Sequence, residues 1–152
     1  MVNTNVSLVK TLYGAFGRGE ISKIVAAAAE DCRWEVVGRP SDFPTLGAHK
    51  GRAGVRRFFD SVDEHLTFHE FVPGEFHALD DKVFVIGHYA MTVKKTGRSF
   101  AGDWIHIFTI RNDQIVDFRE FTDTARAAEA YRDGGAHRPM AEQSAGRALN
   151  GR

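Results

Sequence analysis

The stretch FAGDWIHIFTIRNDQIVDFREFTDT, residues 100–124, decides the fold of this chain. It contains most of two runs rich in valine, isoleucine, phenylalanine and threonine, at residues 99–111 and 114–122, with Asn112 and Asp113 between them. Such runs on either side of a short turn of asparagine and aspartate are typical of a β-hairpin. We therefore predict two antiparallel strands at this position.

Two more strand-like runs, residues 67–77 and 82–93, precede the hairpin and are joined to it by short turns. Parallel neighbours would need long crossover connections, so four consecutive runs predict an antiparallel meander. One earlier strand is expected at residues 32–37, followed by a loop over residues 38–50. Apolar or alanine-rich patterns of helical type predict helices over residues 4–17, 20–29, 51–66 and 123–132.

Helices and an antiparallel sheet that are segregated along the chain predict an α+β domain. We expect a curved antiparallel sheet wrapped by three to four helices around an apolar cavity. A chain of 152 residues can bury a large core without a disulfide or a structural metal.

Composition excludes several classes of function. The 20 basic and 20 acidic side chains give a formal net charge of zero, which argues against nucleic acid or an anionic membrane as the partner. Cys32 is the only cysteine, so no internal disulfide is expected. The start, MVNTNVSLVK, lacks the apolar run of a secretory signal, and no stretch reaches the roughly 18 apolar residues of a membrane span. We expect a cytoplasmic protein.

His106 and Glu120 are the candidate catalytic residues, and the hairpin register decides whether they share a face of the sheet. A two-residue loop, Asn112-Asp113, would send them to opposite faces. A three-residue loop would place Trp104 opposite Glu120 and Glu120 diagonal to His106, with about 7–8 Å between backbones. We favour the three-residue loop, because it collects the large apolar side chains on one face.

A carboxylate and an imidazole in an apolar cavity suit proton transfer near neutral pH. Two structural readings remain open beside the catalytic one. His106 is equally consistent with a satisfied core residue, and Glu120 with a salt-bridge partner of Arg119 or Arg126.

No motif indicates a metal or a cofactor. His65 and His69 straddle the junction between a helix and a strand, and Cys32 has no nearby histidine. The segment at residues 47–52, GAHKGR, lacks the Gly-Lys-Ser/Thr ending of a phosphate-binding loop, and the sequence contains no GxSxG or GxGxxG.

Three stretches carry a family resemblance: LVKTLYGAFGRGEISKIVAAAAEDCRWEVVG at residues 8–38, GAHKGRAGVRRFF at 47–59, and the hairpin at 100–124. Together they resemble the SnoaL-like, ketosteroid isomerase-related branch of the nuclear transport factor 2-like superfamily, over residues 5–131. The resemblance implies a cone-shaped domain over residues 1–133. Residues 134–152 have little hydrophobicity and no period, so we expect a flexible C-terminal tail, or one that orders only against a partner chain.

The catalytic residues of the relatives carry over only in part. The family's polyketide cyclases use an aspartate and a histidine on the last two strands, which correspond to Glu120 and His106. The epoxide hydrolases' arginine and first aspartate correspond to Gly87 and Tyr89, so an epoxide-opening triad is absent. The base of ketosteroid isomerase falls near Val36, so that mechanism is not retained either.

The resemblance implies a cofactor-independent acid/base enzyme of isomerase, cyclase or hydrolase type, acting on a small apolar molecule. Glu120 would move a proton, His106 would relay it, and Trp104 and Tyr89 would donate hydrogen bonds to developing charge. The alternative is a non-catalytic ligand-binding or dimeric adaptor module. The expected substrate-binding residues are Tyr13, Phe16, Trp34, Phe59, Val62, Tyr89, Trp104 and Phe118.

The outer face of the sheet predicts a partner. Phe84, Ile86, Ile105 and Ile107 would project from the face that the helices leave uncovered. An exposed apolar patch of this kind indicates an interface. Relatives commonly pair through this surface, so we predict a homodimer through the outer sheet face.

Overall fold

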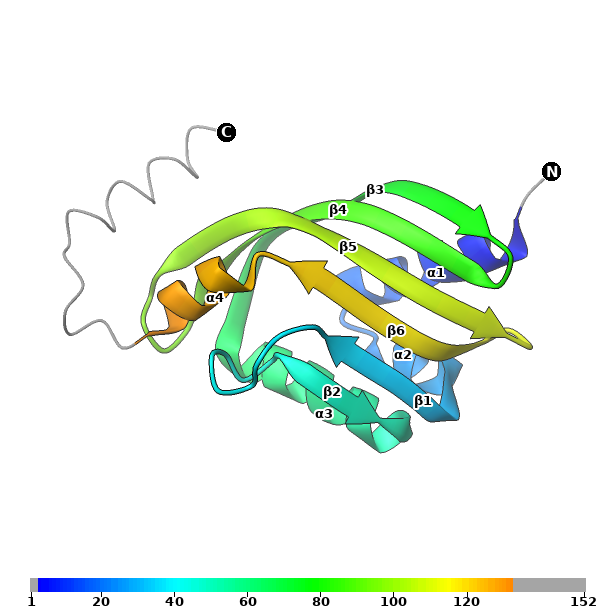
Figure 1. The fold of residues 1–152 in the computed structure, drawn as a ribbon, viewed down its shortest axis with the longest axis horizontal. Coiled ribbons are helices and arrows are strands. Elements are labelled where there is room, and N and C mark those ends of the chain that lie inside the picture. The colour runs from blue at the N-terminus through cyan, green and yellow to red at the C-terminus, as the bar shows by residue number, and fades with distance from the viewer. Residues whose placement is uncertain (1–2, 133–152) are drawn as a thin grey trace.

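Six strands form one curved sheet, and helices α1, α2 and α3 pack against one side of it (Figure 1). This computed structural model describes residues 3–132, so the predicted tail at 134–152 lies outside the described residues. The helices are α1 (Thr4–Gly17), α2 (Ile21–Ala27), α3 (Gly51–His65) and α4 (Thr124–Tyr131). The strands are β1 (Ala28–Val36), β2 (Gly47–Lys50), β3 (Leu66–Leu79), β4 (Lys82–Val93), β5 (Ser99–Arg111) and β6 (Gln114–Thr122).

The α+β class and the antiparallel β3–β6 meander are confirmed. The sheet order is β2-β1-β6-β5-β4-β3, and β1 runs parallel to β6, so the sheet is mixed rather than wholly antiparallel. The predicted loop over 38–50 was partly wrong, because its last four residues form β2 against β1. The predicted helix over 20–29 ends earlier, since the buried alanines Ala28 and Ala29 already belong to β1.

The β5–β6 hairpin corrects both registers considered from the sequence. Asn112 and Asp113 have φ of 52° and 60°, which is the two-residue turn with both central residues left-handed. The register then shifts, because Thr109 pairs with Asp117 whereas Ile110 pairs with Ile115. One extra residue in β6 forms a β-bulge at this point and reverses the facing of every later side chain.

Helix α1 is fixed at both ends. The Asn3 side chain accepts hydrogen bonds from the backbone N–H groups of Asn5 and Val6 at 3.0 and 3.1 Å. Gly19, with φ of 75°, turns the chain directly after the helix. Buried Leu12 faces the sheet, and its neighbour Tyr13 is carried to the same side.

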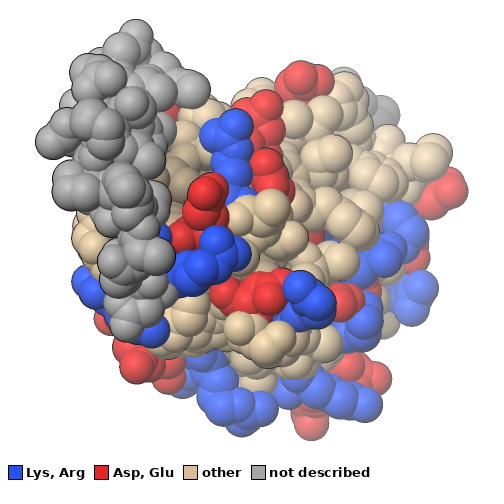
Figure 2. Space-filling model, turned by 60° about the vertical axis from the view of Figure 1, so that its left-hand side comes forward, with Lys and Arg blue, Asp and Glu red and all other residues tan. Residues whose placement is uncertain are grey.

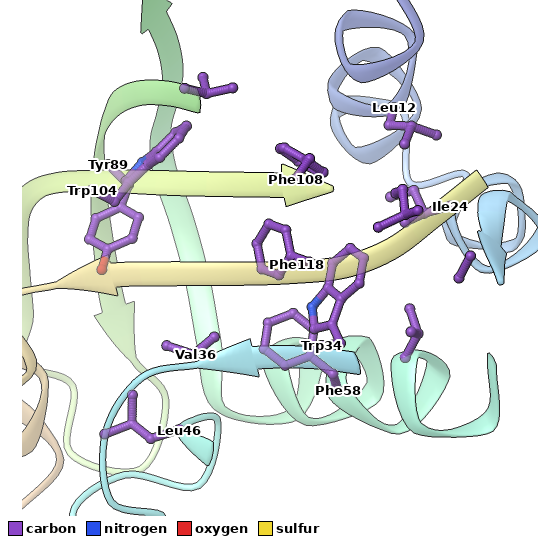
Figure 3. Packing of buried hydrophobic residues seen from close by; sticks show 14 of the residues in the cluster. Leu12, Ile24, Trp34, Val36, Leu46, Phe58, Tyr89, Trp104, Phe108 and Phe118 are labelled. Atoms are coloured by element: carbon purple, nitrogen blue, oxygen red, sulfur yellow. The ribbon is translucent and has the colours of Figure 1, made fainter. Parts of the chain in front are cut away.

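Large aromatic side chains fill the space between sheet and helices. Trp34 on β1 stacks on Phe118 of β6 with ring centroids 4.1 Å apart, and Phe58 of α3 packs beside them (Figure 3). Trp104 is 1% exposed and lies across Gly87 of β4, where a Cβ atom would come within 2.1 Å of the indole.

The molecular surface carries both charge signs. On the face in Figure 2, acidic and basic side chains are interspersed, and neither sign forms an extended patch. None of the helices within residues 3–132 has the length and apolar character that crossing a bilayer requires.

Candidate active site

His106 and Glu120 lie directly opposite each other on β5 and β6, with His106 Nε2 and Glu120 Oε1 2.7 Å apart. The bulge in β6 places both on the inner face, so the predicted diagonal arrangement was wrong. Trp104, which was expected opposite Glu120, pairs with Thr122 instead. Both members of the pair are sheltered from solvent, with side-chain exposures of 5% for His106 and 14% for Glu120.

Tyr13 of α1 extends the pair to a chain of three groups. Its hydroxyl lies 2.7 Å from His106 Nδ1, so both ring nitrogens of the histidine are engaged. The sequence predicted Tyr13 as a substrate contact and gave no sign of this bond, since the two residues are 93 positions apart. The helical stripe shared with Leu12 and Phe16, together with the family resemblance, was the signal that Tyr13 faces the cavity.

As long as His106 is neutral, the hydrogen bonds in this chain all point the same way. With Glu120 ionised, His106 Nε2–H donates to Oε1, and Nδ1 then accepts from the Tyr13 hydroxyl. With Glu120 protonated, the whole chain can invert, and Nδ1–H donates to the Tyr13 oxygen. Burial raises the pKa of Tyr13 well above its usual range, and the charge of Glu120 raises it further. Tyr13 therefore stays neutral and serves as a donor or acceptor rather than as a phenolate.

Within residues 3–132, only one of the two carboxylate oxygens of Glu120 has a hydrogen-bond partner. Oε1 accepts from His106, and none of the described residues donates to Oε2. The two alternative partners are engaged elsewhere, since Arg119 pairs with Asp117 at 3.8 Å and Arg126 with Asp123 at 3.3 Å. A plain salt bridge between Glu120 and either arginine is therefore not what the structure shows.

A cavity of about 100 Å³ opens beside this chain, and Glu120 and His106 both line it. Seven of the eight predicted substrate-binding residues line it too, namely Tyr13, Phe16, Trp34, Phe59, Val62, Tyr89 and Phe118. Trp104 does not. It lies behind the residues that line the cavity. Its ring stacks on His106 and Phe71, with centroid distances of 3.8 and 5.1 Å, so it holds the histidine ring in place from the side away from the cavity.

A second polar chain reaches the same cavity. The Tyr89 hydroxyl lies 2.7 Å from Thr122 Oγ1, and Thr122 donates to the backbone oxygen of Asp103 at 3.1 Å. Because the single proton of Thr122 is used, Tyr89 must be the donor in their bond. Burial raises the pKa of Tyr89, with the nearby charge of Glu120 adding to it. The structure thus leaves Tyr89 an acceptor toward the cavity, contrary to the expected role as donor.

Several cavity residues were not predicted from the sequence. They include Thr45 and Leu46 from the loop before β2, and Phe68 and Phe71 from β3. Strand β3 has two bulges, which break the alternation that would have revealed which side chains face inward.

The other histidines within residues 3–132 have separate partners and do not gather at one place. His69 Nε2 contacts Thr92 Oγ1 at 2.6 Å, and His65 Nδ1 contacts the Ser61 backbone oxygen at 2.8 Å. Within residues 3–132, no three His, Cys, Asp or Glu side chains come close enough together to hold a metal ion.

The family follows from these observations together with a sequence comparison. A family model described as the SnoaL-like domain matches residues 9–118, which is most of the chain. The chain belongs to the SnoaL-like domain family. This confirms the resemblance carried by the hairpin and the two earlier stretches.

Solved structures support the same placement of this SnoaL-like domain. A nuclear transport factor 2-like protein of unknown function from Burkholderia pseudomallei is 26% identical, with a TM-score of 0.79 over 86% of this chain and 99% of that one. Another, from Burkholderia xenovorans, is 34% identical, with a TM-score of 0.72 over 83% of this chain and 94% of that one. TerC, co-crystallised with polyporic acid, is 23% identical, with a TM-score of 0.75 over 84% and 98% of the two chains, which shows a shared fold. No curated protein matches the chain.

Proposed function

We propose that this SnoaL-like protein is a cofactor-independent acid/base enzyme that moves a proton at a carbon next to a carbonyl in a small hydrophobic molecule. The observation that carries the proposal is that the two carboxylate oxygens of Glu120 have different surroundings. Its Oε1 is held by His106 at 2.7 Å, while Oε2 has no donor among residues 3–132 and belongs to a cavity-lining side chain. A carboxylate oriented in this way has one oxygen available as a base.

The proton transfer uses groups that are already in place. Oε2 of Glu120 takes a proton from the substrate carbon, and the electron pair of the C–H bond moves into the enolate. Glu120 then returns the proton to the same or another carbon, which gives exchange or isomerisation. His106 holds Oε1 throughout, and Tyr13 fixes the histidine ring through Nδ1. The aromatic walls exclude water and hold the apolar body of the substrate.

Within this proposal, the reaction type that we favour is an isomerisation or a cyclisation. It is supported by the retained carboxylate–histidine pair, and by an otherwise apolar lining to which no Lys, Arg or Asp of residues 3–132 contributes. An enzyme of this kind needs no cofactor, because an enolate forms by proton removal alone.

Hydrogen–deuterium exchange tests the proposal without the natural substrate. β-Tetralone carries acidic protons beside its carbonyl, and their loss in heavy water can be followed by proton NMR. We expect the native protein to accelerate this exchange and Glu120→Gln to reduce the acceleration about 100-fold or more, since the amide keeps the shape and removes the base. Unchanged acceleration in Glu120→Gln would overturn the assignment.

A non-catalytic ligand-binding module is the second candidate. It is favoured by one observation: both ring nitrogens of His106 have partners, so the histidine is already satisfied without a ligand. Binding of β-tetralone with no accelerated exchange would identify the protein as a binder rather than an enzyme.

A further inference from the structure

We infer that Thr45 donates the hydrogen bond that holds the substrate's carbonyl oxygen, so that the protein selects compounds with an acceptor oxygen close to the acidic carbon. This inference rests on the proposed function and deepens it. It concerns a loop residue that the sequence pattern did not single out.

The hydroxyl groups at the cavity differ in whether their protons are already used in hydrogen bonds. Four hydroxyl groups belong to cavity-lining residues, and three have their protons engaged in the state where Glu120 is ionised and His106 is neutral. Tyr13 donates to His106, Tyr89 donates to Thr122, and Thr122 donates to a backbone oxygen. The hydroxyl of Thr45 has no hydrogen bond within residues 3–132, so it is the one of these four hydroxyl groups with a proton to offer a ligand; the only other unused donor at the cavity within these residues is the indole N–H of Trp34. A ligand oxygen that accepts from this hydroxyl gains a hydrogen bond without breaking one inside the protein.

Thr45 is also held firmly. It occupies the third position of a tight turn that begins at Phe43, continues through Pro44 and is closed by the Leu46 N–H donating to the Phe43 oxygen at 3.0 Å. Proline at the second position favours this turn. Phe43 is 1% exposed and its ring stacks on Tyr131 of α4, with centroids 5.0 Å apart. The turn is therefore anchored in the core, and its threonine is preorganised toward the cavity.

The strand pairing places Thr45 at the right distance from the base. Val36 on β1 pairs with Glu120 on one side and with Gly47 on the other, and Gly47 comes two residues after Thr45. Neighbouring strands are about 4.8 Å apart, so the backbones of Glu120 and Gly47 are separated by about 10 Å. Both side chains line the same cavity, so a carbonyl group and its neighbouring carbon can lie between Glu120 and Thr45.

The pairing of base and donor defines the substrate class. When Oε2 of Glu120 takes the proton, negative charge moves from the carbon to the carbonyl oxygen, and a donor at that oxygen stabilises the charge. The substrate is thus an enolisable ketone or a related carbonyl compound with an otherwise apolar body. An apolar molecule without the oxygen would leave Thr45 unpartnered.

Two probes and three variants test the inference. β-Tetralone and tetralin have the same ring system and differ in the carbonyl, and their binding can be measured by calorimetry. We expect Thr45→Val to weaken β-tetralone binding about 5-fold and to slow the exchange about 100-fold, while tetralin binding stays unchanged. Thr45→Ser keeps the hydroxyl and should retain most of both properties. Thr109→Val is the control, at a second buried threonine that does not line the cavity and whose hydroxyl accepts from Lys82 at 2.8 Å.

The outcomes separate this inference from the proposed function. Equal losses for both probes in Thr45→Val, or no loss for β-tetralone, would overturn the role of Thr45 while leaving Glu120 as the base. Full exchange activity in Glu120→Gln would overturn the proposed function, and the two affinities would still decide the role of Thr45. Failure of the native protein to bind β-tetralone would overturn both.

Discussion

Glu120 lies directly across the β5–β6 ladder from His106, and their contact of 2.7 Å depends on a single extra residue in β6. Val116 is that residue, because Ile115 and Asp117 pair with consecutive residues of β5. Without the bulge, the two-residue turn would send Glu120 to the outer face of the sheet. The candidate base is therefore positioned by a local irregularity of the strand, in line with the frequent use of bulges beside active sites.

Removal of the imidazole should destabilise the protein as well as disable the site. His106→Leu leaves the Glu120 carboxylate and the Tyr13 hydroxyl without their shared partner in a nearly closed environment. We expect a loss of about 3 kcal/mol in the free energy of unfolding, measured by urea denaturation. His77→Leu removes an exposed histidine and should cost less than about 0.5 kcal/mol.

A double-mutant cycle distinguishes pairing from simple loss of packing. Adding Glu120→Leu to His106→Leu removes both members of the pair, so the double variant should be more stable than the sum of the single losses predicts. Simple additivity would show that the bond between the two side chains contributes nothing to stability.

The buried tyrosines predict a loss of stability at alkaline pH. The pKa values of Tyr13 and Tyr89 are raised in the folded protein, chiefly by burial, so both remain protonated when the unfolded chain ionises. Their contribution is complete below pH of about 10 and declines as pH rises further, by about 1.4 kcal/mol per pH unit for each tyrosine. Urea unfolding measured between about pH 9 and 11 should show this decline, and Tyr13→Phe should reduce its slope. A slope that Tyr13→Phe leaves unchanged would contradict the prediction for that residue.

The sequence predicted the elements more reliably than the contacts between them. Period and turn residues located the meander, because each strand there follows its neighbour through a short turn. The bulge left no such signal, since Ile115 and Val116 are both apolar and β-branched and either could point inward. The parallel pairing of β1 with β6 also left no signal in the sequence, because the two strands are far apart along the chain.

In the candidate site, too, the sequence identified some residues and missed others. The sequence singled out His106 and Glu120 because polar residues in an apolar row are conspicuous. It did not identify Thr45, because a threonine beside a proline in a loop is ordinary until the fold brings it to the cavity. It also placed Trp104 in the cavity wall, whereas the missing side chain at Gly87 lets the indole lie flat behind His106.

Cys32 should be chemically inert in the folded protein. The side chain is fully buried, and burial together with Asp117 and Asp31 raises the pKa of the thiol to about 12. Because the thiolate is the reactive form, labelling by iodoacetamide near pH 8 should be at least about 1000-fold slower than in urea-unfolded protein. Native labelling at the unfolded rate would show that β1 opens readily.

Gly87 should be intolerant of any side chain. A Cβ atom there would lie 2.1 Å from the Trp104 ring, so Gly87→Ala must displace an indole that also packs on His106. We expect a loss of about 2–3 kcal/mol in the free energy of unfolding and a changed tryptophan fluorescence spectrum. Gly102→Ala, on the neighbouring strand and with open space around its Cβ, is the matched control and should be close to neutral. Equal stability of the two variants would contradict the close packing of Trp104.

The outer face of the sheet carries an apolar row suited to a second copy of the chain. Ile86, Ile105 and Phe121 are cross-strand neighbours on β4, β5 and β6, and they are 38%, 41% and 39% exposed. Arg119 lies over the Phe121 ring at 5.6 Å, and the exposed Asp103 lies at the other margin of the row. An apolar centre with both charge signs at its edge is complementary to itself under a two-fold rotation.

We therefore expect a homodimer that Ile105→Glu converts to a monomer, because the substitution places a charge at the centre of the paired faces. Light scattering coupled to size-exclusion chromatography measures the change directly. Leu79→Glu introduces the same charge at a more exposed leucine, 64% exposed at the end of β3, and should leave the dimer intact. The cavity lies on the opposite side of the sheet from this row, so the monomeric variant should still bind β-tetralone with native affinity. A native protein that is monomeric at all concentrations, or an Ile105→Glu variant that remains dimeric, would exclude this face as the interface.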